Sequence, residues 1–151
     1  MKRRKALINT AGLAGISALT AKNAFTADIE TARFGNVIIP HEKEMGKEKH
    51  VPIIDAPSRV KAGEPFMVTV EVGKTVPHPN TVEHHIKWIQ LYALEEGSQY
   101  VVNVGTFEFF PTFSAPKVTL PVMIQKNSTL YALEHCNLHG VWDYSVKVEV
   151  E

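Results

Sequence analysis

The chain has 151 residues, a length that suits one domain with a hydrophobic core and excludes a larger multidomain protein. Its hydrophobic fraction of 44% and its charged fraction of 21% are typical of a soluble globular protein. The single cysteine, Cys136, excludes a disulfide within the chain. The formal net charge is zero, but the basic residues are distributed unevenly along the sequence.

Residues 1–27 have the pattern of an export signal. They contain five basic residues and no acidic one, a moderately apolar middle and small residues near their end. The apolar stretch is too short and too polar for a membrane span. The pair Arg3 and Arg4 resembles a twin-arginine signal, so we expect an exported protein, periplasmic or extracytoplasmic. Without these residues, 11 basic residues oppose 16 acidic ones, and a net charge of −5 argues against nucleic acid as a partner.

Residues 28–50 form a polar lead-in without a regular period, and the pattern changes at residue 51. From there to residue 151, short segments carry apolar residues at every second position, which is typical of half-buried strands. The clearest segments cover residues 66–72, 85–94, 100–109, 118–124, 129–136 and 144–150. With turn sequences between them, the pattern predicts one all-β domain over 51–151, an immunoglobulin-like antiparallel β-sandwich of about seven strands.

Histidines in the predicted loops and at strand ends accompany the single thiol. The seven histidines are His41, His50, His78, His84, His85, His135 and His139. Loops held by a rigid sheet often carry ligands. Four such imidazoles and one thiolate exceed the four ligands of a closed structural zinc, and they leave one position open on an octahedral metal. Imidazole and thiolate ligands favour iron or copper over magnesium or calcium.

A blue-copper site is the first alternative to consider. Such sites use two histidines, one cysteine and a weak axial methionine on a β-sandwich. No methionine follows His139, and Met123 is the nearest one before it. The expected order of cysteine, histidine and methionine is therefore absent, which favours iron.

Three segments resemble the iron centre of superoxide reductases, the neelaredoxin and desulfoferrodoxin family. They are EKHVP at 48–52, HPNTVEHHIKWI at 78–89 and CNLHGVW at 136–142, and the resemblance covers about residues 41–151. It implies one iron per chain, as Fe2+ or Fe3+. The implied equatorial ligands are His50, His78, His84 and His139, with Cys136 as the axial thiolate. Spacing alone does not choose His84 over His85 or exclude His135.

The resemblance further implies an enzyme, a superoxide reductase, that reduces superoxide by one electron to hydrogen peroxide. A thiolate opposite the open position increases electron density there, as thiolates do in haem enzymes. Two other functions stay open at this point. One is a non-enzymatic electron-transfer or sensing domain with iron or copper, and the other is a β-sandwich stabilised by a four-ligand zinc.

Lys49 and Glu48 directly precede His50. A cation beside the open position can attract the superoxide anion over about 8 Å, the Debye length at physiological salt, although the net charge of the domain repels it. In the resembled family this lysine attracts superoxide and orders the water that protonates the product, and the glutamate can occupy the sixth position on ferric iron. We therefore expect catalytic roles for Lys49 and Glu48.

The resemblance also bears on partners. Larger members of the family carry a second iron domain with four cysteines, which this chain cannot form with one cysteine. Electrons must then come from an external donor, such as a rubredoxin-like protein or a cytochrome. The family also suggests a homo-oligomer, commonly a tetramer.

Overall fold

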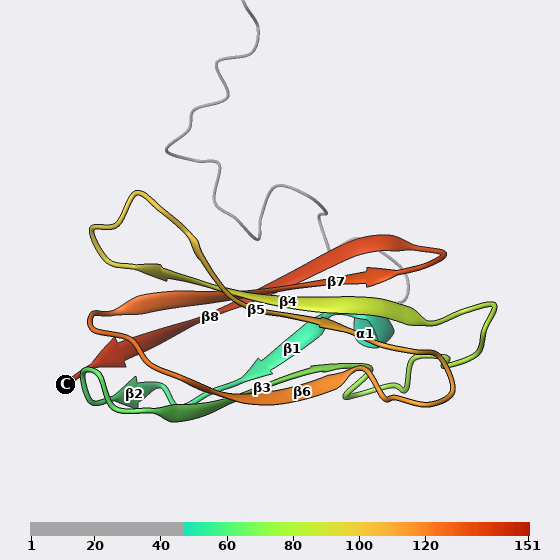
Figure 1. Cartoon of the computed structure of the whole chain (residues 1–151), viewed down its shortest axis with the longest axis horizontal. Helices are drawn as coiled ribbons and strands as arrows, with labels where there is room; N and C mark the ends of the chain where they lie inside the picture. Colours follow the sequence, from blue (N-terminus) through green and yellow to red (C-terminus); the bar gives the residue numbers. More distant parts are fainter. Residues whose placement is uncertain (1–46) are drawn as a thin grey trace, which may run out of the picture.

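Two β-sheets packed face to face make up the part of the chain that the computed structural model describes, residues 47–151 (Figure 1). The smaller sheet has the order β1-β3-β6, with bounds Pro52–Asp55, Phe66–Val72 and Lys117–Val122. The larger sheet has the order β2-β8-β7-β4-β5, with bounds Arg59–Val60, Gly140–Val150, Ser128–Cys136, Ile86–Glu95 and Val102–Glu108. One helical turn, α1 at Lys47–His50, precedes β1. Within the described range, no helix has the length and apolar character needed to cross a membrane.

The predicted all-β sandwich is confirmed, and it has eight strands. The sequence predicted no strand at β2, because two residues are too few to show a period. β2 pairs with β8 in parallel, whereas the other neighbouring pairs are antiparallel. The finer assignment as immunoglobulin-like stays a prediction.

Alternating side chains of the two sheets form the core between them. In β3 the residues Phe66, Val68, Val70 and Val72 are buried, as their period of two predicts. They belong to one cluster with buried apolar residues of β4 and β7, among them Leu91. The core therefore fixes the larger sheet against the smaller one along most of its length.

At one end of the sandwich, three strand ends of the larger sheet meet. Ile86 at the start of β4 pairs with Cys136 at the end of β7, which in turn pairs with Gly140 at the start of β8. α1 lies at the same end, opposite the end that carries the C-terminus (Figure 1). The predicted export signal and residues 28–46 of the predicted lead-in lie outside the described residues, and α1 forms the end of that lead-in.

Candidate metal centre

Four of the five predicted metal ligands form one tight group at this end of the sandwich. One potential ligand atom each from His50, His84, Cys136 and His139 lies within 4.8 Å of the others. These side chains come from separate elements, because His50 ends α1, His84 lies in the loop before β4, and Cys136 ends β7. Only the folded sandwich brings them together, since the sequence separates His50 from Cys136 by the whole core.

Two contacts identify which ring nitrogens face the centre of the group. His50 Nε2 lies 3.0 Å from His139 Nδ1, and the Cys136 Sγ lies 3.5 Å from the same Nδ1. His139 thus presents Nδ1 to the cluster, whereas His50 presents Nε2. The turn that carries His139 closes at Gly140, whose φ of 78° lies in the left-handed region that favours glycine.

His78, the fifth predicted ligand, adjoins the same group. Its ring centroid lies 4.8 Å from that of His50 and 4.6 Å from that of His84. Its Nδ1 donates a hydrogen bond of 2.6 Å to the carbonyl of Pro79, and its buried Nε2 has no hydrogen-bond partner among the described residues. A carbonyl that holds Nδ1–H in this way fixes the tautomer that leaves Nε2 free to bind a metal.

Gly73 allows the close approach of the His78 loop to the end of β3. Its φ is 77°, and a Cβ at this position would lie 2.5 Å from the backbone nitrogen of His78. A side chain at residue 73 would therefore displace the segment that carries His78.

The loop of His84 is held by hydrogen bonds of Thr81. The Thr81 N–H donates to the carbonyl of His84 at 2.9 Å, and the His84 N–H donates to Thr81 Oγ1 at 3.1 Å. The Nε2 of His84 is buried and has no hydrogen-bond partner in the described range. Two neighbouring imidazoles, those of His78 and His84, therefore carry a buried nitrogen that a bound metal would satisfy.

Burial also keeps these imidazoles neutral. It lowers the pKa of His78 to about 4, an effect that the Pro79 carbonyl partly offsets and the surrounding histidines reinforce. The pKa of His84 is lowered first by burial and then by the charges of His139, His85 and Lys49. Neutral imidazole is the form that binds metals, so both rings are ready to coordinate at neutral pH.

The thiol of Cys136 is fully buried. Burial raises its pKa, while the backbone N–H groups of Leu138 and His139 donate to the sulfur and act in the opposite direction. These two amides are the donors that a bound thiolate needs around its sulfur. A bound metal would favour the deprotonated sulfur, and its binding would release the thiol proton.

Glu134 and Trp142 also border the cluster, and the sequence did not single out Glu134. Burial raises the pKa of Glu134 to about 9, and neither carboxyl oxygen has a hydrogen-bond partner among the described residues. Its charged form would raise the pKa of Cys136, but at neutral pH the buried carboxyl is protonated. A sequence signal existed, because Glu134 interrupts the inward series Leu130, Ala132 and Cys136.

Trp142 packs against the cluster. Its ring stacks on His50 with centroids 4.7 Å apart and an interplanar angle of 15°. Its Nε1–H also donates to the carbonyl of His139 at 3.3 Å. The indole therefore contacts two of the clustered histidines.

The remaining predicted residues divide into three cases. Lys49 is half-buried in α1, and its charge contributes to the lowered pKa of His84, which places the ammonium group near the cluster. Glu48 belongs to α1, but its side chain lies outside the described part of the structure, as does all of His41. His85 instead donates through Nδ1 to the carbonyl of Thr81, and the ring of His135 lies 5.5 Å from that of Trp88.

The cluster fits a mononuclear iron centre. Its donors are imidazole nitrogens and one sulfur, a set that suits iron, copper or zinc and not magnesium or calcium. The buried nitrogens of His78 and His84 without hydrogen-bond partners indicate that a cation completes the site. The chemistry of these residues therefore fits a redox metal.

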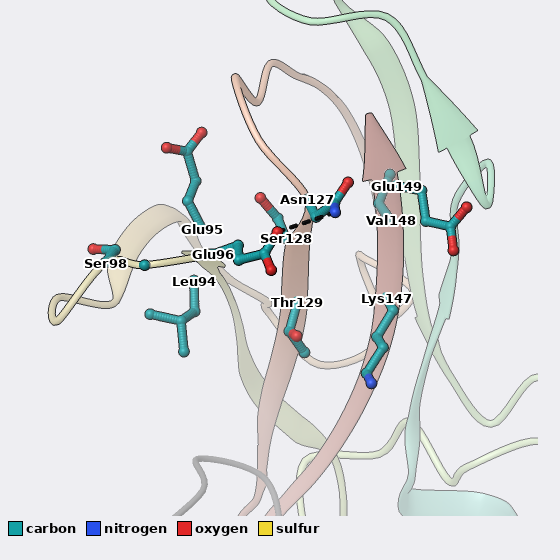
Figure 2. Close-up of a pocket in the computed structure, with 11 residues that line it drawn as sticks. Leu94, Glu95, Glu96, Ser98, Asn127, Ser128, Thr129, Lys147, Val148 and Glu149 are labelled. Carbon is teal, nitrogen blue, oxygen red and sulfur yellow. Dashed lines mark hydrogen bonds between the residues drawn. The ribbon is translucent and has the colours of Figure 1, made fainter. Parts of the chain in front are cut away.

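A separate pocket of about 400 Å³ lies at the opposite end of the sandwich (Figure 2). It is lined by residues from the β4–β5 turn, the β6–β7 turn and β8, among them Glu96, Asn127 and Lys147. Asn127 donates to a carboxylate oxygen of Glu96 at 3.1 Å (Figure 2). None of the predicted site residues lines this pocket, so its size does not make it the functional site.

Fold and cluster together define a β-sandwich protein with a His/Cys metal centre. Residues 42–145 match the desulfoferrodoxin family. The chain is 43% identical to a superoxide reductase of Pyrococcus horikoshii over 105 residues, covering 68% of this chain and 89% of that protein. It is 39% identical to the neelaredoxin of Megalodesulfovibrio gigas over 116 residues, covering 69% and 89%. The solved superoxide reductase (neelaredoxin) of Ignicoccus hospitalis aligns with a TM-score of 0.69 at 42% identity, covering 74% of this chain and 90% of that one. The chain therefore belongs to the desulfoferrodoxin family.

Proposed function

We propose that the protein is a superoxide reductase with one iron held by His50, His78, His84, His139 and Cys136. The observation that carries the proposal is the convergence of four imidazoles and one buried thiol at one end of the sandwich. The family match and the superoxide reductases among the similar proteins support it. Bound iron would supply the single electron, and solvent the two protons, that convert superoxide to hydrogen peroxide.

The protein shapes access to this centre from one side. Cys136, His50 and His78 are buried, whereas His139 is exposed to solvent. The thiolate therefore lies on the inner side of the centre, and a small anion approaches from the side where imidazole edges reach the solvent. The N–H groups of Leu138 and His139 hold the sulfur in its charged form once the proton has left.

Lys49 attracts the substrate and Glu48 acts at the open position in this proposal. The charge of Lys49 influences His84, so it is near enough to raise the local concentration of superoxide. Lys49 also orders the water that delivers protons to the product. Glu48 precedes it in α1, and its carboxylate would be a further ligand for the oxidised metal.

The proposal includes an external electron donor in the same compartment, a rubredoxin-like protein or a cytochrome. The cysteine content supports this part of the proposal. A second iron site with four cysteine ligands cannot form in a chain with one cysteine, so the electron comes from another protein. The twin-arginine-like pattern of residues 1–27 supports export to the periplasm after folding around the metal. We further propose a homo-oligomer, a tetramer, for the domain over residues 51–151.

Metal analysis and an optical spectrum of the oxidised protein test the function. We expect one iron per chain and a visible thiolate-to-iron band that reduction removes and superoxide restores. Bound zinc would instead support a structural role. Copper with an intense blue band, in a centre that does not respond to superoxide, would support electron transfer, and either result would refute the reductase.

A further inference from the structure

Asn137 connects the turn of Cys136 to the loop of His84 through three hydrogen bonds. Its side-chain Oδ1 accepts from the His85 N–H at 2.9 Å, and its Nδ2 donates to the carbonyl of Glu83 at 2.8 Å. Its own backbone N–H donates to the carbonyl of His85 at 3.1 Å. One residue therefore holds both chain neighbours of His84 and directly follows Cys136.

The β4–β7 ladder is irregular where this connection occurs. Ile86 pairs with Cys136 and Trp88 pairs with His135, so Lys87 is an extra residue on β4. Such a bulge bends the strand locally and weakens the pairing around it. The backbone bond from Asn137 continues the ladder by one pair past the bulge, and its side chain extends the contact to Glu83, which lies beyond the strand.

The loop of His84 is closed mainly on itself. Thr81 bonds the backbone of His84 in both directions, and His85 donates through Nδ1 to the carbonyl of Thr81. These bonds fix the shape of the loop but do not fix its distance from Cys136. The β4–β7 pairing holds the strand side of the loop near Cys136, and the two side-chain bonds of Asn137 extend this restraint to both chain neighbours of His84.

We propose that Asn137 is a positioning residue that sets the distance between the imidazole of His84 and the sulfur of Cys136. It acts through Glu83 and His85 and touches neither the metal nor the substrate. The same turn presents the N–H groups of Leu138 and His139 to the sulfur, so a shift of Asn137 moves the thiolate and its donors together.

A second asparagine provides a matched control. Asn127 also accepts from one backbone N–H, that of Val150 at 2.9 Å, and donates to one oxygen, on Glu96 at 3.1 Å. It lies in the pocket at the other end of the sandwich (Figure 2). Strand β4 separates the two ends by about 30 Å, since each strand residue advances about 3.3 Å.

The experiment is a Co2+ titration of the metal-free full chain in three forms, the wild type, Asn137→Ala and Asn127→Ala. The thiolate-to-cobalt band reports the sulfur, and the ligand-field bands report the imidazole geometry. We expect Asn137→Ala to weaken Co2+ binding roughly 10-fold to 100-fold and to shift both bands. Asn127→Ala should leave both the affinity and the bands as in the wild type.

Stability is measured alongside by urea unfolding of the metal-free proteins. The Asn137→Ala variant keeps the backbone bond from residue 137 to His85, so we expect this variant to fold. Its loss of stability should be about as large as that of Asn127→Ala. If Asn137→Ala does not fold, Asn137→Ser takes its place in the titration. Wild-type affinity and bands in the Asn137 variant would overturn the inference, as would an equal loss of affinity in the Asn127 variant. The inference rests on the proposed metal centre, and a wild-type chain that binds no Co2+ would refute both.

Discussion

His50 Nε2 lies 3.0 Å from His139 Nδ1, although 89 positions separate the two residues in the chain. The contact exists because α1 is held against the turn between β7 and β8, where Trp142 stacks on one ring and bonds the backbone of the other residue. Two ring nitrogens at this distance share either a proton or a cation. The metal centre is therefore assembled by the tertiary fold, and its donors already face one another.

Replacing Cys136 by serine is expected to remove the visible band and retain part of the metal binding. A serine hydroxyl does not ionise at neutral pH and supplies no thiolate-to-iron charge transfer. The imidazoles still hold the metal, with lower affinity. The optical spectrum and iron content of the oxidised variant measure both effects, and an unchanged visible band would show that Cys136 is not a ligand.

Replacing Lys49 by alanine is expected to slow the reaction with superoxide about 10-fold at low salt and to flatten its dependence on ionic strength. The cause is the loss of a local cation in an acidic domain. Pulse radiolysis of the reduced protein at several salt concentrations measures the rate. Iron content should not change.

The control for Lys49 is Lys147→Ala, which removes the same charge from the pocket at the other end of the sandwich. It should leave the rate at physiological salt close to that of the wild type, because screening there limits the reach of a surface charge to about 8 Å. Lys49→Arg should keep most of the rate. Equal rates for Lys49→Ala and the wild type at low salt would refute the steering role.

Much of the fold was predictable because strand residues here alternate between core and solvent. The period of two in residues 66–72 predicted the inward face of β3, which the core confirms. β2 has only two residues and β1 only four, so neither is long enough to show a period. The parallel pairing of β2 with β8 depends on distant segments, which no local pattern encodes.

The site was predictable in its chemistry and not in its geometry. Motifs in the chain named five ligands, but the choice of Nδ1 on His139 follows from a turn whose shape only the fold determines. The three bonds of Asn137 join segments about fifty positions apart, and the register between β4 and β7 sets them. Glu134 carried an unused signal, an acid at an inward strand position.

Replacing Glu134 by glutamine is expected to stabilise the metal-free protein at alkaline pH. Burial in the folded state raises the pKa of this carboxyl from its ordinary 4.5 to about 9. Between these two pH values the carboxyl is therefore protonated in the folded chain and ionised in the unfolded chain. The contribution of this carboxyl to stability is therefore greatest below pH 4.5 and falls as the pH rises through this window, by up to about 1.4 kcal/mol per pH unit. Urea unfolding at pH 5 and pH 8 should show a shallower pH dependence for the glutamine variant.

The exposed Glu108 provides the control for this measurement. Glu108→Gln makes the same substitution at the surface and leaves the buried carboxyl in place, so the pH dependence should stay that of the wild type. If the free energy of unfolding of Glu134→Gln changed between pH 5 and pH 8 as much as that of the wild type, the buried carboxyl would not hold its proton.

Replacing Gly73 by alanine is expected to destabilise the protein by about 3 kcal/mol and to weaken metal binding, whereas Gly97→Ala should cost only about 1 kcal/mol. Both glycines have a positive φ, 77° at Gly73 and 80° at Gly97, so both variants carry the same backbone strain. The two sites differ in the room available to a Cβ. At residue 73 a Cβ would lie 2.5 Å from the backbone nitrogen of His78, whereas at residue 97 it would have no neighbour within 4 Å. Urea unfolding and a Co2+ titration of both variants separate the strain from the displacement of His78. Equal losses in the two variants would show that a Cβ at residue 73 does not displace the His78 loop.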